Sequence, residues 1–124
     1  MSDQTIFQAL RDGGLSPVGA CAMMGNMWAE SGFRSNNVQD NWTVSDNDYT
    51  YNVDHGIITK SQFERDSYGY GLCQWTYYTR KAGLYDYAKS LGVSIGDEKM
   101  QCDYCIFELQ KYYLYMLLLL HIDN

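Results

Sequence analysis

Hydrophobic and polar positions in the first third of the chain predict one well-defined helix. Ser16-Pro17 is typical of a helix start, because the serine hydroxyl can accept a hydrogen bond from an unpaired amide and proline has no amide to lose. Few helix breakers follow, and Gly32 suits the left-handed residue that ends many helices. We therefore predict a helix over residues 17–31.

Two more helices are predicted in the second half of the chain. Residues 79–91 carry apolar side chains at helical spacing and precede Gly92. A last helix is predicted from about residue 97 onward, and it leads into an apolar run at 112–120. We expect the end of the chain, 112–124, to be a core helix that closes the domain. The alternative is a divergent end that leaves an apolar patch exposed.

The stretch from 35 to 66 has a different pattern. It is rich in Asn and Asp and has little helical periodicity, which predicts a long loop or a short irregular hairpin. Taken together, the segments predict a mainly α fold. The length of 124 residues is typical of one domain with a core of its own, so we expect a single domain over 1–124.

Charge and hydropathy narrow the class of partners. Asp and Glu number 15 against 9 Lys and Arg, a formal net charge of -6, which argues against nucleic acid and anionic lipid as partners. Asp3 stands where a secretory signal would carry a base, and no apolar run approaches the ~20 residues that span a bilayer. We expect neither a signal peptide nor a membrane span.

The cysteines and histidines do not form a recognisable metal or catalytic pattern. Cys102 and Cys105 are one close pair, but a zinc site of this kind would need a second pair. We expect free and mostly buried thiols, no metal and no cofactor. His55 and His121 have no evident orienting partner, and we expect both at the surface. The four cysteines are Cys21, Cys73, Cys102 and Cys105.

One acid stands out from the other fourteen. On the helix predicted over 17–31, Met23, Asn26, Met27 and Glu30 share a face, so that Glu30 ends a largely apolar stripe. A carboxyl group among methionine and tryptophan side chains should lose water and stay protonated near neutral pH. That is what a general acid needs in order to protonate the leaving oxygen of a glycosidic bond.

A second segment supports this chemistry. Residues 68–75 read Tyr-Gly-Tyr-Gly-Leu-Cys-Gln-Trp. Gly69 and Gly71 flank Tyr70 and would allow a ligand to approach the backbone closely, while Gln74 and Trp75 offer an amide and an aromatic plate suited to sugar. The plain alternative is a glycine-rich turn with aromatic residues in the core.

The two segments together resemble the phage tail lysozyme family, within the wider set of goose-type lysozymes and lytic transglycosylases. That set pairs a helix ending in Glu-Ser-Gly-Phe, here residues 30–33, with a later Gly-Leu-x-Gln, here residues 71–74. The similarity runs from about 16 to 109. Cys73 departs from the pattern, since a small residue such as Ala is usual there.

The resemblance implies a lysozyme-like α-helical fold and a cleft for the glycan strand of peptidoglycan. Glu30 would be the proton donor at the bond between N-acetylmuramic acid and N-acetylglucosamine. The resemblance also implies substrate-binding residues close to this acid, namely Ser31, Tyr70, Gly71, Gln74 and Trp75. It suggests other phage tail or lysis proteins as partners, and a protein held in the virion or the host cytoplasm before it acts at the cell wall.

The second carboxylate and the reaction class stay open at this point. Asp66 is the first candidate for a second carboxylate, because it is the acid nearest to the 68–75 segment. The products could be those of a muramidase or of a lytic transglycosylase. Two alternatives to a glycosidase are a cysteine-dependent hydrolase of peptidoglycan peptides or amides, and an inactive glycan-binding module of a phage tail.

Overall fold

A computed structural model describes residues 2–39, 41 and 43–122, with the backbone alone for 115–122. Within these residues there are six helices and no strand, which confirms the mainly α prediction. The helices are α1 (Ser2–Asp12), α2 (Pro17–Ser31), α3 (Asp46–Asp54), α4 (Lys60–Arg65), α5 (Tyr78–Leu91) and α6 (Glu98–Ile122).

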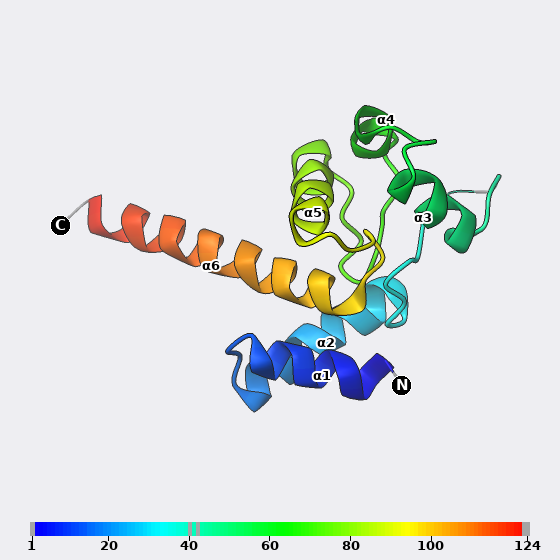
Figure 1. Ribbon diagram of the computed structural model, residues 1–124. Coiled ribbons are helices and arrows are strands. Elements are labelled where there is room, and N and C mark those ends of the chain that lie inside the picture. Colours follow the sequence, from blue (N-terminus) through cyan, green and yellow to red (C-terminus); the bar gives the residue numbers. More distant parts are fainter. Residues whose placement is uncertain (1, 40, 42, 123–124) are drawn as a thin grey trace.

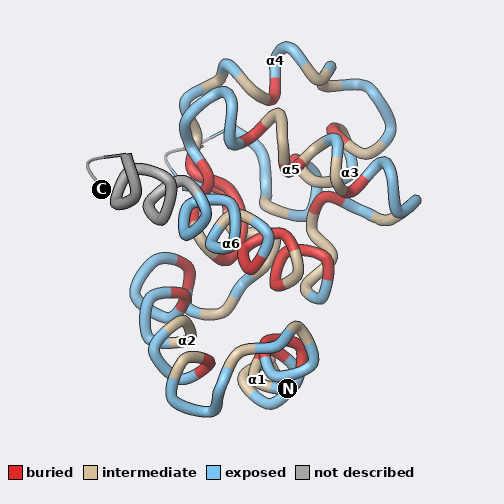
Figure 2. Tube along the Cα trace, turned by 90° about the vertical axis from the view of Figure 1, so that its left-hand side faces the viewer, coloured by how far each residue is buried: buried red, intermediate tan, exposed pale blue. Residues whose placement is uncertain are grey.

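The long helix α6 lies between two groups of helices (Figure 1). On one side α1 packs against both α2 and α6, and on the other side α5 packs against both α4 and α6. The buried residues follow the first half of α6 and the faces turned toward it (Figure 2). The core therefore joins the two groups through α6.

Residues at the two ends of α2 explain where this helix begins and ends, as predicted. The Ser16 side chain accepts a hydrogen bond from the amide of Gly19, and Pro17 occupies the first turn. Gly32 ends the helix in the left-handed conformation at φ 61°, and its amide donates to the carbonyl of Trp28. The helix α1 was not predicted, although Ile6, Ala9 and Leu10 are buried and have the three- and four-residue spacing of a helix face.

The prediction of a loop or hairpin over 35–66 is wrong for two segments, because α3 and α4 form there. Ser45 caps α3 by accepting from the amide of Asp48, and Thr59 and Gln62 form a reciprocal capping box at the start of α4. These caps supply partners for amides that a short helix would otherwise leave unpaired. The many Asn and Asp residues of this stretch favoured a loop and made the capping residues hard to recognise in the sequence.

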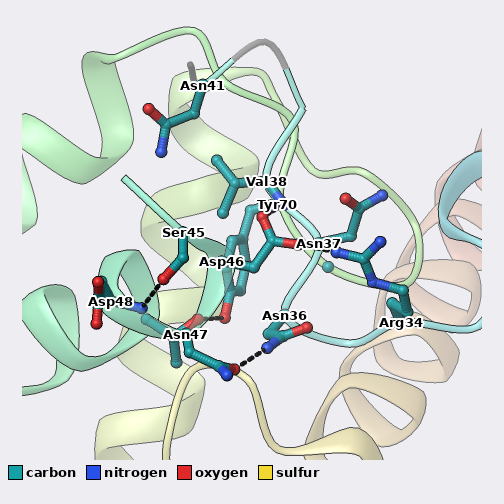
Figure 3. A network of polar contacts seen from close by, with 12 residues as sticks. Arg34, Asn36, Asn37, Val38, Asn41, Ser45, Asp46, Asn47, Asp48 and Tyr70 are labelled. Atoms are coloured by element: carbon teal, nitrogen blue, oxygen red, sulfur yellow. Dashed lines mark hydrogen bonds and ion pairs between the residues drawn. The ribbon is translucent and has the colours of Figure 1, made fainter. Parts of the chain in front are cut away.

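Polar contacts fasten the start of α3 to the preceding chain (Figure 3). Asp46 pairs with Arg34 and accepts a hydrogen bond of 3.1 Å from the amide of Val38. The side-chain amides of Asn36 and Asn47 are joined at 2.6 Å. Several of the acids and amides that suggested a solvated loop therefore hold a folded segment together.

The end of α6 departs from the predicted core helix. Tyr112, Tyr113 and Leu114 are 61–71% exposed, because α6 runs past the end of α5 (Figure 1). The prediction of a core helix is therefore wrong at 112–114. The side chains from 115 onward and residues 123–124 lie outside the described residues.

Candidate functional site

A cavity of about 380 Å³ lies where α2, α5 and α6 meet. It combines side chains from α2, from the turn before α5, and from α5 and α6. The lining residues are Met23, Asn26, Glu30, Cys73, Arg80, Cys105, Glu108, Leu109 and Tyr112.

Glu30 lies on the rim of this cavity, in the last turn of α2. Met23 and Asn26 lie seven and four residues before it on the same helix face and line the same cavity, as the spacing predicted. Glu30 itself is exposed, so its expected burial among apolar side chains is wrong. Met27 packs into the core, and Trp28 is 63% exposed with its ring against Phe33.

The second carboxylate of the cavity is Glu108 on α6, which the sequence did not indicate. Arg80 donates to it twice, from Nη2 to Oε1 at 2.9 Å and from Nε to Oε2 at 3.1 Å. Trp75 Nε1 donates to Oε1 at 2.8 Å. These three hydrogen bonds fix the position of the Glu108 carboxylate. Because Arg80 and Glu108 are 28 residues apart, only the packing of α5 on α6 brings them together.

Asp66, the predicted second carboxylate, lies elsewhere. It follows α4 and does not line the cavity with Glu30. It accepts hydrogen bonds from Lys81 Nζ at 2.5 Å, from the hydroxyl of Tyr49 and from the amide of Tyr68 at 3.0 Å. Burial lowers the pKa of Lys81, while its hydrogen bond to Asp66 acts in the opposite direction. The contacts of Asp66 are those of a buried ion pair in the fold.

The glycine-rich segment forms a tight turn below the cavity. Tyr70 and Trp75 close it through two hydrogen bonds between their backbones, at 2.9 and 3.0 Å, and both side chains are fully buried. Gly71 takes φ 80°, and Gln74 Nε2 donates to the carbonyl of Gly71 at 2.9 Å. None of these four residues lines the cavity, and Trp75 is joined to it through Glu108. Their substrate-binding role stays a prediction.

Ser31 joins the two sequence motifs. Its side chain is buried, with Oγ 2.9 Å from the carbonyl oxygen of Met27 and 3.0 Å from that of Leu72. The hydroxyl thus ties the end of α2 to the glycine-rich turn. Gln101 holds the other side of this turn by accepting from the amide of Leu72 at 2.9 Å. The predicted substrate contact of Ser31 remains a prediction, since its hydroxyl is used within the fold.

Two of the cysteines are neighbours in the same cavity. Cys73 Sγ lies 3.3 Å from Cys105 Sγ, Cys102 is buried in α6, and Cys21 is exposed. Among the described residues, no cluster of three or more His, Cys, Asp or Glu could hold a metal ion. His55 stacks on Tyr51 at the end of α3, away from this cavity, and the side chain of His121 lies outside the described residues.

A second cavity of about 690 Å³ adjoins the first. The two share Arg80, Glu108 and Tyr112 and therefore lie side by side along α6; together they are called the groove below. Tyr77 and Phe107 give this second part an aromatic lining.

Across the part of the chain that the structure describes, no helix has the length and apolar character needed to cross a membrane.

Comparison with known proteins gives one match. No curated protein and no solved structure is significantly similar to the chain. A family model described as phage tail lysozyme matches residues 2–121. Since the match covers nearly the whole chain, the chain belongs to the phage tail lysozyme family, phage-associated lysozyme-type enzymes whose substrate is the peptidoglycan of the bacterial cell wall.

Proposed function

We propose that the protein cleaves the glycan strand of peptidoglycan at the bond between N-acetylmuramic acid and N-acetylglucosamine, with Glu30 as the general acid. One observation carries this proposal. The cavity is lined by two carboxylates, and Glu108 is fully engaged by Arg80 and Trp75. The side chain of Glu30 forms no hydrogen bond or ion pair with any residue that the structure describes, so its carboxyl group can meet a substrate.

The groove supports an extended sugar substrate. Aromatic faces suit the apolar face of a sugar ring; Tyr77 and Phe107 line the second cavity, and Tyr112 lines both cavities. Asn26, one turn before Glu30, offers an amide that can both donate to and accept from sugar hydroxyls. A strand that lies along α6 would place one glycosidic bond at the rim where Glu30 stands.

The proposed chemistry needs Glu30 to carry a proton when the bond breaks. A glycan that covers the rim would exclude water from the exposed carboxyl group and favour its neutral form. Glu30 would then protonate the leaving oxygen while positive charge develops on the sugar. Glu108 is balanced by Arg80, so we assign it the role of a positioning residue that fixes Trp75 and Arg80 at the base of the groove.

The test replaces the acid by its amide. Glu30→Gln should lower the release of glycan fragments from purified cell walls by about 10²–10⁴-fold, since general acid catalysis is worth that much. Because Glu30 is exposed, the thermal midpoint should be unchanged. Asp48→Asn removes the same charge from an exposed position on α3 and should keep full activity. An unchanged rate for Glu30→Gln would overturn the proposal.

The products separate the remaining mechanisms. Mass spectrometry of digested walls should find reducing muramic ends if water is the acceptor and anhydro ends if the enzyme is a lytic transglycosylase. Freed stem peptides would instead support a cysteine-dependent hydrolase, which Cys73 and Cys105 at the cavity allow in principle. Tight glycan binding without fragments would support an inactive tail module.

A further inference from the structure

Cys73 and Cys105 are placed as a pair that can be oxidised. Their sulfur atoms are 3.3 Å apart although the residues are 32 positions apart in the sequence. A disulfide bond has an S–S distance of ~2.05 Å, so a closure of roughly 1.3 Å would form one. Rotation of two side chains can supply a movement of that size. Neither cysteine has another cysteine partner among the described residues.

We propose that Cys73 and Cys105 form a reversible disulfide when the protein meets a low-molecular-weight disulfide such as oxidised glutathione. The bond would connect the glycine-rich turn to α6 beneath the cavity. This site of modification does not depend on the role proposed for Glu30, because it rests only on the geometry of the two thiols.

The surroundings give the two sulfurs different parts in the reaction. Cys73 is half-buried and lines the cavity, so it is the thiol that an oxidant reaches first. Cys105 is buried, and its hydrogen bond with Cys73 lowers the pKa of its thiol. Burial and the nearby charge of Glu108 oppose this effect, and the charge of Arg80 assists it. The same hydrogen bond and burial raise the pKa of the Cys73 thiol. Cys105 therefore has the character of a resolving thiolate.

The thiol–disulfide exchange takes place in two steps. As Cys73 attacks one sulfur of oxidised glutathione, its proton passes to Cys105, its hydrogen-bond partner. The glutathione S–S bond breaks, and one glutathione thiolate leaves and takes that proton from Cys105. The Cys105 thiolate then attacks the sulfur of Cys73 and expels the second glutathione thiolate. The two cysteine protons end on the two released glutathione molecules. Two protein thiols are oxidised by two electrons, and one glutathione disulfide is reduced.

The bond should make the protein more resistant to heat. It would tie a turn to a helix 32 residues away and so restrict the unfolded chain. A loop of this size raises the thermal midpoint by roughly 10–15 °C when the native geometry needs little adjustment. The cavity would keep its shape, since both sulfurs already lie at its base.

The experiment incubates the full chain in glutathione buffers of increasing oxidised fraction. Mass spectrometry should show a species lighter by two hydrogen atoms, peptide mapping should join residue 73 to residue 105, and excess reduced glutathione should reverse both. Cys73→Ser and Cys105→Ser should each abolish this species. Cys21→Ser and Cys102→Ala, at the exposed and the other buried cysteine of the structure, should retain it.

The unaltered chain also provides a readout that does not depend on the variants folding. Its oxidised form should melt at the higher temperature. A lasting glutathione adduct on Cys73, a bridge through Cys21 or Cys102, or no loss of hydrogen at any buffer ratio would overturn the proposal.

Discussion

Lys81 is a cation without access to solvent, and its surroundings explain how the fold tolerates it. Its side chain is 0% exposed, and its ammonium group donates to Asp66 at 2.5 Å and to the carbonyl of Tyr68 at 2.9 Å. The same group lies 4.3 Å from the centre of the Phe63 ring. These contacts replace water around the charge, so each partner depends on the other.

Removing this cation should be among the more harmful single changes in the chain. Lys81→Met leaves Asp66 with a largely buried charge and no cation beside it, and we expect it to lower the free energy of unfolding by about 3–5 kcal/mol. Lys60→Met removes an exposed lysine of the same kind, paired with Asp86, and should leave that free energy nearly unchanged. Urea unfolding of the two variants compares them directly. Equal losses would mean that burial of Lys81 carries no special cost.

Individual elements differ in how far their own sequence specifies them. The bounds of α2 follow from Ser16, Pro17 and Gly32, which act on adjacent backbone groups. The short helices α3 and α4 also carry capping signals in their sequence, but their apolar pattern is too brief to distinguish them from a polar loop.

The candidate site likewise has one feature that is set within a single helix and others that depend on how the helices pack. The face that carries Glu30 is set within one helix and could be predicted from spacing alone. Its exposure and its neighbour Glu108 depend on how α2, α5 and α6 pack, which no local pattern records. We predicted Asp66 as the second carboxylate because it is close in sequence to the glycine-rich turn, but its side chain pairs with Lys81.

Gly32 and Gly71, one in each of the two sequence motifs, allow a test of how much the glycine-rich turn depends on packing. Both have left-handed backbones, Gly32 at φ 61° and Gly71 at φ 80°. A Cβ at Gly32 would meet nothing within 4 Å, so Gly32→Ala should cost only the backbone strain, about 1 kcal/mol.

A Cβ at Gly71 would lie 2.8 Å from the side-chain amide of Gln101, which also accepts from the amide of Leu72. Gly71→Ala should therefore destabilise by about 2–4 kcal/mol, since it adds overpacking to the same strain. Chemical unfolding of the two variants measures the difference. A smaller loss for Gly71→Ala than for Gly32→Ala would show that Gln101 yields without cost.

At the scale of the whole molecule, the core that unites the two helix groups contains many groups able to lose a proton. Burial raises the pKa of Tyr49 and of Tyr70 well above the usual range, and it raises the pKa of Tyr104 to about 12. Burial likewise raises the pKa of the Cys102 thiol to about 12. Folding thus keeps these groups protonated at a pH where the unfolded chain would release their protons.

The sign of the pH dependence follows from this difference in bound protons. Above about pH 9 for the thiol and pH 10 for the tyrosines, the folded state binds more protons than the unfolded state, so stability falls as pH rises. Lys81, whose pKa is lowered by burial, acts in the opposite sense below about pH 10.5 but contributes only one group. We expect the free energy of unfolding to decline above pH 10 by about 1.4 kcal/mol per pH unit for each buried tyrosine.

Replacing one of these tyrosines measures how much it contributes to the fall in the free energy of unfolding at high pH. Tyr70→Phe removes a phenol that is fully buried and bonded to Thr50, so it should lower the stability at neutral pH by about 1 kcal/mol through the lost hydrogen bond. Above pH 10 the variant should lose stability less steeply than the parent, by about 1.4 kcal/mol per pH unit, because one titrating group is gone. Urea unfolding at intervals from pH 7 to about pH 11.5 measures both slopes across the range where the unfolded tyrosines ionise. Parallel curves for parent and variant would mean that Tyr70 ionises alike in the folded and unfolded chain, which its complete burial makes costly.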